Sequence, residues 1–220
     1  MQWARIGEDL REVRKTFGRS APGGGRRTEI SGAPEVLDVD IDSMIEREPV
    51  TVILSQMGWI RALKGHQPLE AEVKFRDGDG PFKALHAETT DKLIVAGGNG
   101  RFFTLAVNDL PGGRGLGEPI RLMVDLPNDV AVIDLFPWHE ADSWLVASTE
   151  GNGFIIDAAG ILAQTRAGKQ VLNGPLALCR KAGGDHVVTV GENRKLLVFP
   201  RAELPEMTRG KGVRLQRFKD

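Results

Sequence analysis

The sequence predicts an all-β fold, a propeller-like array of four-stranded blades that follows a short α-helix. From Val50 onward, short runs rich in β-branched and aromatic residues, such as "KLIVAG" and "HVVTV", alternate with turn residues. The runs pair into four hairpins of one design, whose turns centre on Gly58, Gly100, Gly151 and Asn193. The turns are 42, 51 and 42 residues apart, and a hairpin period of about 40 to 50 residues is typical of bladed arrays.

The N-terminal segment is predicted to be helical. Its apolar residues recur at spacings of 3 and 4, at Trp3, Ile6, Leu10, Val13 and Phe17. Gly18 is a natural stop. The following "RSAPGGGRRTEISGAP" is typical of a linker, and the acidic "EVLDVDIDSMIEREP" is either an extended tether or a short strand. We therefore expect a helix within residues 1–18, a linker over 19–49 and the β array over 50–220.

Each blade has room for two strands besides its hairpin, for example in "PIRLMVD" and "VAVIDLF". Blades in such arrays bury their faces against one another, so none is stable alone. In the fourth turn, Asn193 replaces glycine because asparagine tolerates the left-handed conformation.

Charge is distributed unevenly along the chain. Residues 51–160 carry 9 Lys and Arg against 15 Asp and Glu, whereas residues 161–220 carry 12 against 5. The C-terminal end is therefore suited to a polyanion. No run of 18 apolar residues and no signal-like apolar stretch is present, so no membrane insertion is expected. Cys179 is the only cysteine, which excludes a disulfide framework and suggests a small buried apolar side chain.

A loop with glycine and basic residues follows each hairpin. The second to fourth loops read "GGRGLGE", "TRAGKQ" and "TRGKGVR", and they place Arg114, Arg166 and Arg209 14, 15 and 16 residues past their turns. This spacing predicts equivalent places on three blades. Glycine beside arginine lets peptide N–H groups and a guanidinium share one anion. The alternative is that each loop is only a tight, solvated turn.

The candidate phosphate-contacting residues also include cations of the first loop and of the fourth turn. Lys64 lies only 6 residues past its turn, so the first loop is either divergent or a different element. The full set is Lys64, His66, Arg114, Arg166, Lys169, Arg194, Lys195, Arg209, Lys211 and Arg214.

Other kinds of site find little support. "GGRGLGE" misses a dinucleotide-binding fingerprint by one position, and no P-loop is present. The four histidines lie far apart in sequence, and no Cys/His pair has zinc spacing. "DGDG" is too short for an EF-hand loop. No catalytic or metal residues are expected. The aromatic residues that follow the turns are expected in the core rather than stacked on bases: Trp59, Phe102, Phe103 and Phe154.

Several long stretches resemble, in order, the C-terminal domain of the A subunit of bacterial topoisomerase IV, a type IIA topoisomerase related to gyrase. They are "EPVTVILSQMGWIRALKGH", "GNGRFFTLAVNDLPGGRGLGEPI", "LVASTEGNGFII", "TRAGKQVL" and "GENRKLLVFPRAELPEMTRGKGVRL". "LREVRKTFGRSAPGGGRRTEI" resembles the exit from the catalytic core. The resemblance implies a β-pinwheel, a propeller-like array with swapped strands. Without it, a true propeller would fit equally well.

The resemblance also implies a function. It implies a cytoplasmic, chromosome-associated domain that binds and bends duplex DNA along a basic rim and positions the transported duplex for decatenation and relaxation. The first blade, "RALKGHQPLEAE", lacks the glutamine-led arginine- and glycine-rich box of gyrase. The implied partners are the ATPase B subunit of the enzyme, a second copy of the A subunit, both through the catalytic core, and chromosome-organising or inhibitory proteins. The whole enzyme uses ATP and magnesium, and no cofactor is expected in this fragment.

Two departures from the family pattern limit these expectations. Strand cleavage in the family uses a tyrosine, and this chain has none, so the chain by itself is not expected to be catalytic. The chain also ends soon after its fourth hairpin, so its last blade is expected to be incomplete or missing. The alternative function is a propeller-like module that binds proteins.

Overall fold

The computed structural model describes residues 2–22, 24, 45–191 and 194–217. The chain divides into two compact units, Met1–Asp40 and Ile41–Asp220. The first contains α1 (Gln2–Phe17), whose apolar stripe is exposed, with Trp3 at 85% and Phe17 at 73%. The predicted helix is therefore confirmed. Residues 35–44 of the acidic stretch lie outside the described residues.

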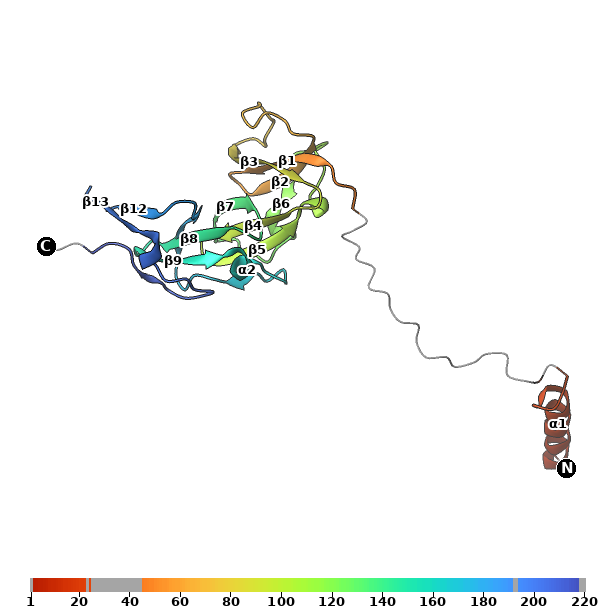
Figure 1. Ribbon diagram of the computed structural model, residues 1–220. Helices are drawn as coiled ribbons and strands as arrows, with labels where there is room; N and C mark the ends of the chain where they lie inside the picture. The colour runs from red at the N-terminus through yellow and green to blue at the C-terminus, as the bar shows by residue number, and fades with distance from the viewer. Residues whose placement is uncertain (1, 23, 25–44, 192–193, 218–220) are drawn as a thin grey trace. The chain divides into compact units, whose positions relative to one another are not determined.

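The second unit is a series of antiparallel sheets, which we name blade 1, blade 2, blade 3 and hairpin 4 (Figure 1). Blade 1 consists, in strand order, of β3 (Pro81–Glu88), β1 (Pro49–Ser55), β2 (Trp59–Lys64) and β6 (Glu118–Pro119). Blade 2 consists of β7 (Val132–Pro137), β4 (Lys92–Gly97), β5 (Arg101–Ala106) and β10 (Lys169–Gln170). Blade 3 consists of β11 (Leu176–Lys181), β8 (Ser143–Ser148), β9 (Asn152–Asp157) and β14 (Val213–Arg214). Hairpin 4 consists of β12 (His186–Val190) and β13 (Leu196–Pro200).

The last strand of each blade comes from the chain that follows the next hairpin. β6 follows the β4–β5 hairpin of blade 2 but pairs with β2 of blade 1. In the same way, β10 crosses back to β5 of blade 2, and β14 crosses back to β9 of blade 3. This exchange is the swapped-strand topology of a β-pinwheel, so the predicted fold class is confirmed.

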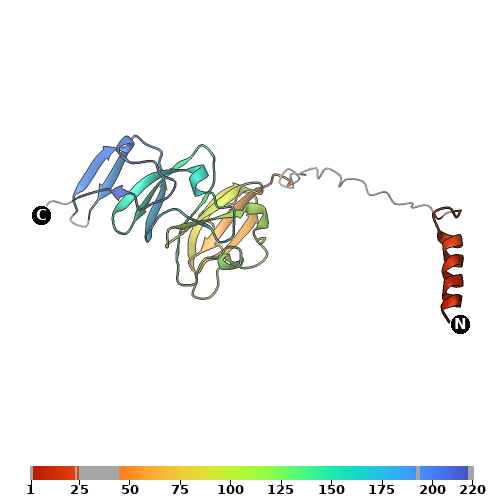
Figure 2. The same cartoon turned by 90° about the horizontal axis from the view of Figure 1, so that it is seen from below.

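The core lies between consecutive blades because each strand presents alternate side chains to its neighbours. Val52 and Leu54 of β1 pack with Val95 and Phe103 of blade 2. Phe102, on the other face of blade 2, packs with blade 3 in a second cluster. A third, smaller cluster joins blade 3 to hairpin 4. Figures 1 and 2 show the blades following one another in chain order, with β12 and β13 at the far end from β1.

The inner and outer edges of the array follow from contacts between the blades. β7 contacts both β3 and β11, so the first strand of each sheet lies toward the inside of the array. The swapped strands β6, β10 and β14 occupy the opposite edge of each sheet. They therefore form the outer perimeter.

Three of the four predicted turns are confirmed at their glycines. Gly58, Gly100 and Gly151 have φ of 81°, 75° and 77°, in the region that favours glycine. Asn193 lies outside the described residues, and Arg194 in that turn has a φ of 60°.

The strand expected in "PIRLMVD" is wrong beyond its start. β6 covers only Glu118–Pro119, and a 3-10 helix follows, η3 (Ile120–Leu122). The strand expected in "VAVIDLF" is confirmed as β7. The remaining short helices are η2 (Val107–Asp109), α2 (Ala158–Ile161) and η4 (Arg201–Glu203).

The outer face of blade 1 is covered by residues 65–80, which we name the cap loop. Thr51 and Ile53 face away from blade 2, yet they are only 1% and 5% exposed. The Thr51 hydroxyl donates to the carbonyl of Gly65 (2.9 Å) and accepts from the amide of Gln67 (2.7 Å). Blade 1 is thus covered by its own chain where the described array begins, over a hollow of about 470 Å³.

Candidate functional site

The basic loops coincide with the swapped strands. Each basic loop begins at the leucine that follows a short helix. It ends two residues after the residue whose amide donates to the turn glycine of the preceding blade. We name residues 110–122, 162–173 and 204–217 the perimeter strip. The amides of Ile120, Val171 and Leu215 donate to the carbonyls of Gly58, Gly100 and Gly151 at 2.9, 3.0 and 2.9 Å. The strand register is shared: Glu118 pairs with Ile60, Lys169 with Phe102, and Val213 with Gly153.

The last glycine of each loop is required by packing rather than by an anion. Gly117, Gly168 and Gly212 immediately precede the swapped strands and have φ of 89°, 69° and 78°. A Cβ on Gly117 would lie 2.4 Å from the carbonyl oxygen of Ile60, and one on Gly212 would lie 2.4 Å from that of Gly153. The glycine half of the motif is therefore structural, and only the cations and the remaining peptide groups are available to a ligand.

The three segments of the strip are joined end to end by hydrogen bonds. The amide of Asp125, just past the first segment, donates to the carbonyl of Arg166 in the second (2.9 Å). Asn173 and Gly210 connect the second segment to the third, because the Asn173 amide donates to the Gly210 carbonyl at 2.8 Å. The strip is thus one continuous track along three blades.

Positive charge increases along this track. The first segment has two arginines and Glu118. The second has Arg166 and Lys169 and no acidic residue. The third has four cations and Glu206. The track is therefore most basic at its C-terminal end, in agreement with the charge asymmetry of the sequence.

Several cations of the strip are held in place by neighbouring groups. Arg166 Nη2 donates to the carbonyl of Leu122, and Arg209 Nε donates to Asn173 Oδ1 (3.4 Å). Lys211 Nζ lies 2.8 Å from Glu150 Oε2. This contact lowers the pKa of Glu150, chiefly through the hydrogen bond and charge of Lys211. Both side chains are more than half exposed, so the pair contributes little to stability but competes for Lys211.

The predicted equivalence of the three arginines is only partly correct. Counted back from the glycine before each swapped strand, Arg114 and Arg209 are both three residues away, whereas Arg166 is two away. Arg166 therefore occupies the position that Gly210 has in the third loop. The reason is that "TRAGKQ" is shorter than the other loops, which counting from the hairpin turn does not reveal.

Two of the predicted residues lie away from the strip. Lys64 ends β2 and pairs with Glu48 (3.0 Å). His66 stacks on His86 with ring centroids 4.4 Å apart, so two histidines treated as isolated in the sequence are neighbours. Lys64 and His66 lie away from the strip because the first loop continues into the cap loop and contains no swapped strand. Lys64 and Arg114 nevertheless line one open hollow on blade 1, of about 930 Å³.

The turn of hairpin 4 extends the strip. Gln216 Nε2 donates to the carbonyl of Lys195 (3.2 Å), which brings Arg194 and Lys195 beside the third segment. Arg217 and Arg101 were not predicted. Arg101 Nη1 donates to the carbonyl of Ala167 in the second segment (2.6 Å). The feature of the sequence that could have indicated Arg101 is its position directly after a turn glycine.

An ionic link between blades was also not predicted. Asp134 of β7, 5% exposed, forms ion pairs with Lys83 of β3 and with Arg180 of β11, the latter at 2.8 Å. It therefore joins three blades on their inner side.

Cys179 is 1% exposed, and burial raises the pKa of its thiol, which agrees with the expected apolar role.

The aromatic residues behave largely as predicted. Phe102, Phe103 and Phe154 are fully buried. Trp59 is half-buried, and the Arg76 guanidinium lies 3.7 Å from its ring centroid. Within the described ranges, no group of three or more His, Cys, Asp or Glu side chains is placed to bind a metal ion. The helices of those ranges include none that is long and apolar enough to cross a membrane.

Swapped β-blades with a cationic outer edge define a β-pinwheel domain of the class found in type IIA topoisomerases. The profile of the family "DNA gyrase C-terminal domain, beta-propeller" matches residues 91–139, 142–174 and 185–220. The chain belongs to this family.

The relatives narrow the resemblance further. The chain is 44% identical over its whole length to the A subunit of DNA topoisomerase 4 from Caulobacter vibrioides, and 39% identical over 99% of its length to that of Rickettsia conorii. It spans 30% of each relative. The solved C-terminal domain of Escherichia coli ParC matches 78% of the chain with a TM-score of 0.72 and 28% identity, and 72% of that domain is covered. The resemblance to the C-terminal domain of the topoisomerase IV A subunit is therefore confirmed.

Proposed function

We propose that the β-pinwheel binds duplex DNA along the perimeter strip and bends it. In a longer topoisomerase chain, it would position the transported duplex for decatenation and relaxation. The observation that carries the proposal is the continuity of the strip, because cations spaced along one outer edge suit a long polyanion better than a single phosphate. Bending a duplex of 20–30 base pairs costs about 1–6 kcal/mol, which several phosphate contacts offset.

We further propose that the domain acts in the cytoplasm, on the chromosome, in an assembly with the ATPase B subunit of the enzyme and with a second copy of the A subunit. The similarity to A subunits of DNA topoisomerase 4 supports this proposal. ATP and magnesium are expected to act elsewhere in that assembly.

The test is a fluorescence anisotropy titration with a labelled duplex of arbitrary sequence at several salt concentrations. Each phosphate neutralised contributes about 0.9 to the slope of log affinity against log salt. Arg209→Ala and Lys211→Ala should each weaken binding and reduce that slope by about one. Glu150→Gln should strengthen binding, because it releases Lys211 from its ion pair.

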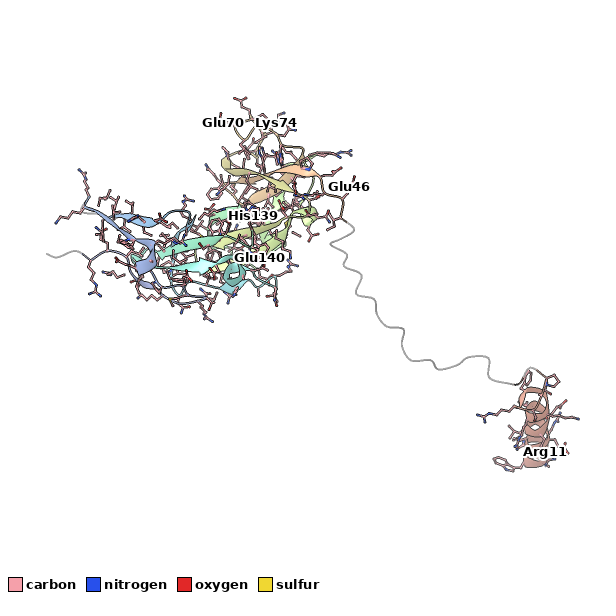
Figure 3. All side chains as sticks on the ribbon, in the orientation of Figure 1. Arg11, Glu46, Glu70, Lys74, His139 and Glu140 are labelled. Carbon is pink, nitrogen blue, oxygen red and sulfur yellow. The ribbon has the colours of Figure 1, made fainter. Side chains whose placement is uncertain are left out.

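The matched control is Lys74→Ala. Lys74 is an exposed cation of the cap loop, and Figure 3 shows it with Glu70 on the side of blade 1 away from β4 and β5. The Lys74→Ala variant should bind DNA with the same affinity as the unaltered protein. Salt-independent binding, or an equal loss in Lys74→Ala and Arg209→Ala, would contradict the proposal.

Protein binding is a second candidate function, and one surface favours it. Hairpin 4 exposes a continuous aliphatic face, made by the cross-strand pairs Val188–Val198 and Val190–Leu196, with exposures of 50–68%. Exposed apolar patches of this kind often mark interaction sites. A pull-down from nuclease-treated lysate, compared between the unaltered protein and Val188→Thr/Val198→Thr, would test it. Equal capture by both would rule this face out.

A further inference from the structure

The charge of the strip changes sign at one position that the strand register makes equivalent in the three blades. Glu118 of β6 lies where blade 2 has Lys169, because both pair with the second residue after a turn glycine. Blade 3 has the neutral Val213 at this position. Cross-strand pairing fixes which face of a sheet a side chain occupies, so Glu118 and Lys169 occupy the same face at the outer edge of their blades.

The charge of Glu118 is not compensated locally. Glu118 is exposed, and within the described chain it has no ion-pair or hydrogen-bond partner for its carboxylate. The third segment differs in its balance of charge: Glu150 beside it is neutralised by Lys211, and its own exposed Glu206 is outnumbered by four cations. A duplex that reached blade 1 would therefore meet a free carboxylate on the strip.

The other cations of blade 1 are engaged elsewhere. Lys64 pairs with Glu48, and Arg76 lies on the ring of Trp59. Arg61 is 7% exposed, and its guanidinium donates to the carbonyls of Gly115 (2.5 Å) and Lys74 (2.8 Å). Arg114 is exposed, and the hollow that it lines is also lined by Glu48 and Glu72. Blade 1 thus presents little free positive charge at this edge.

We propose that Glu118 marks the end of the DNA track, so that the duplex contacts blade 2, blade 3 and hairpin 4 but not blade 1. This inference rests on the proposed function. One side chain would then set the length of DNA that is bound, because repulsion of a phosphate by Glu118 outweighs attraction by Arg114. Arg121, the other arginine of the first segment, is turned toward the carbonyls of Pro127, Asn128 and Val130, to which its guanidinium donates. Reversing that charge should add blade 1 to the track.

The experiment compares Glu118→Lys with the unaltered protein on two duplexes, one of about 10 base pairs, one helical turn, and one of about 30 base pairs. On the longer duplex, Glu118→Lys should raise the salt slope by about one and extend the hydroxyl-radical footprint. On the shorter duplex it should leave affinity within about twofold of the unaltered protein, because one turn is already held by blades 2 and 3. The melting temperature, measured in parallel, should be unchanged because Glu118 is exposed.

The control is Glu70→Lys, which changes net charge equally but lies on the cap loop (Figure 3). Lys169→Glu provides the reverse change and should weaken binding to both duplexes. If Glu118→Lys gains no more than Glu70→Lys while Lys169→Glu loses affinity, the inference is overturned and DNA binding on the strip stands. If Lys169→Glu and Arg209→Ala both bind normally, the proposed function itself fails.

Discussion

At the scale of single residues, the arginine–glycine loops combine two separate demands. Gly117, Gly168 and Gly212 allow the chain to turn against the neighbouring blade, where a side chain would collide with backbone. The arginines beside them, Arg114, Arg166 and Arg209, are exposed, so packing leaves the position and number of the cations free to differ. The glycines thus fix the geometry of the strip, and the cations set its charge.

The glycine role predicts a loss of stability in Gly212→Ala. The substitution combines a left-handed φ of 78° with a Cβ only 2.4 Å from the Gly153 carbonyl oxygen. We expect a loss of about 2–4 kcal/mol in the free energy of unfolding, seen as a fall of roughly 5–10 °C in melting temperature. Gly183→Ala is the control, since its Cβ would meet nothing within 4 Å. Equal melting temperatures for the two variants would contradict this account.

The sequence identified the cationic residues better than their register. Eight of the ten predicted residues lie on the strip or at the hairpin 4 turn beside it. The offset of Arg166 was hidden because the distance from a hairpin turn depends on loop length, whereas the structural reference is the glycine before each swapped strand. Their contact with DNA stays a prediction.

At the scale of elements, the inner strands are tied together by Asp134. Its carboxylate is nearly buried and pairs with cations from the blades on either side. Lys83 and Arg180 are 51 and 46 residues away in sequence, so no local pattern marks the link. In the sequence, an aspartate within an apolar strand has no evident partner. Its partners become apparent only when the neighbouring blades are folded beside it.

Asp134→Asn should uncouple the blades. We expect a loss of about 1–3 kcal/mol in the free energy of unfolding, less than for a fully enclosed pair because Lys83 and Arg180 are 33% and 71% exposed. Urea unfolding followed by tryptophan fluorescence measures it. The matched control is Asp142→Asn, which removes the pair with Lys181 inside blade 3 (2.6 Å). A loss no larger than in this control would contradict a role between blades.

At the scale of the whole β unit, the two ends of the described array differ. The cap loop covers the outer face of blade 1, whereas the aliphatic face of hairpin 4 is exposed. Repeat arrays need a sealed terminal face to avoid association. The first end is therefore a structural terminus, and the second is a surface available to further contacts.

This difference predicts opposite responses to substitution. Phe75→Ala in the cap loop should cost about 1–2 kcal/mol, because Phe75 is half-buried over blade 1. Val188→Thr/Val198→Thr on hairpin 4 should change stability by less than about 0.5 kcal/mol and should reduce self-association. Thermal melts and sedimentation velocity measure the two effects. A strongly destabilised hairpin 4 variant would show that this face is not free.

The sequence by itself determined the repeat, the hairpins, the turn glycines and the uneven charge, because these depend on local preference and spacing. It could indicate the swapped topology only through resemblance, since strands of two residues such as β6, β10 and β14 leave no periodic signal. The tertiary structure decided which blade each basic loop joins, and therefore that the loops form one track. The tertiary structure also singled out Glu118. Only the strand register shows that this carboxylate occupies the position that Lys169 has in blade 2, and this is the basis for proposing that it ends the DNA track.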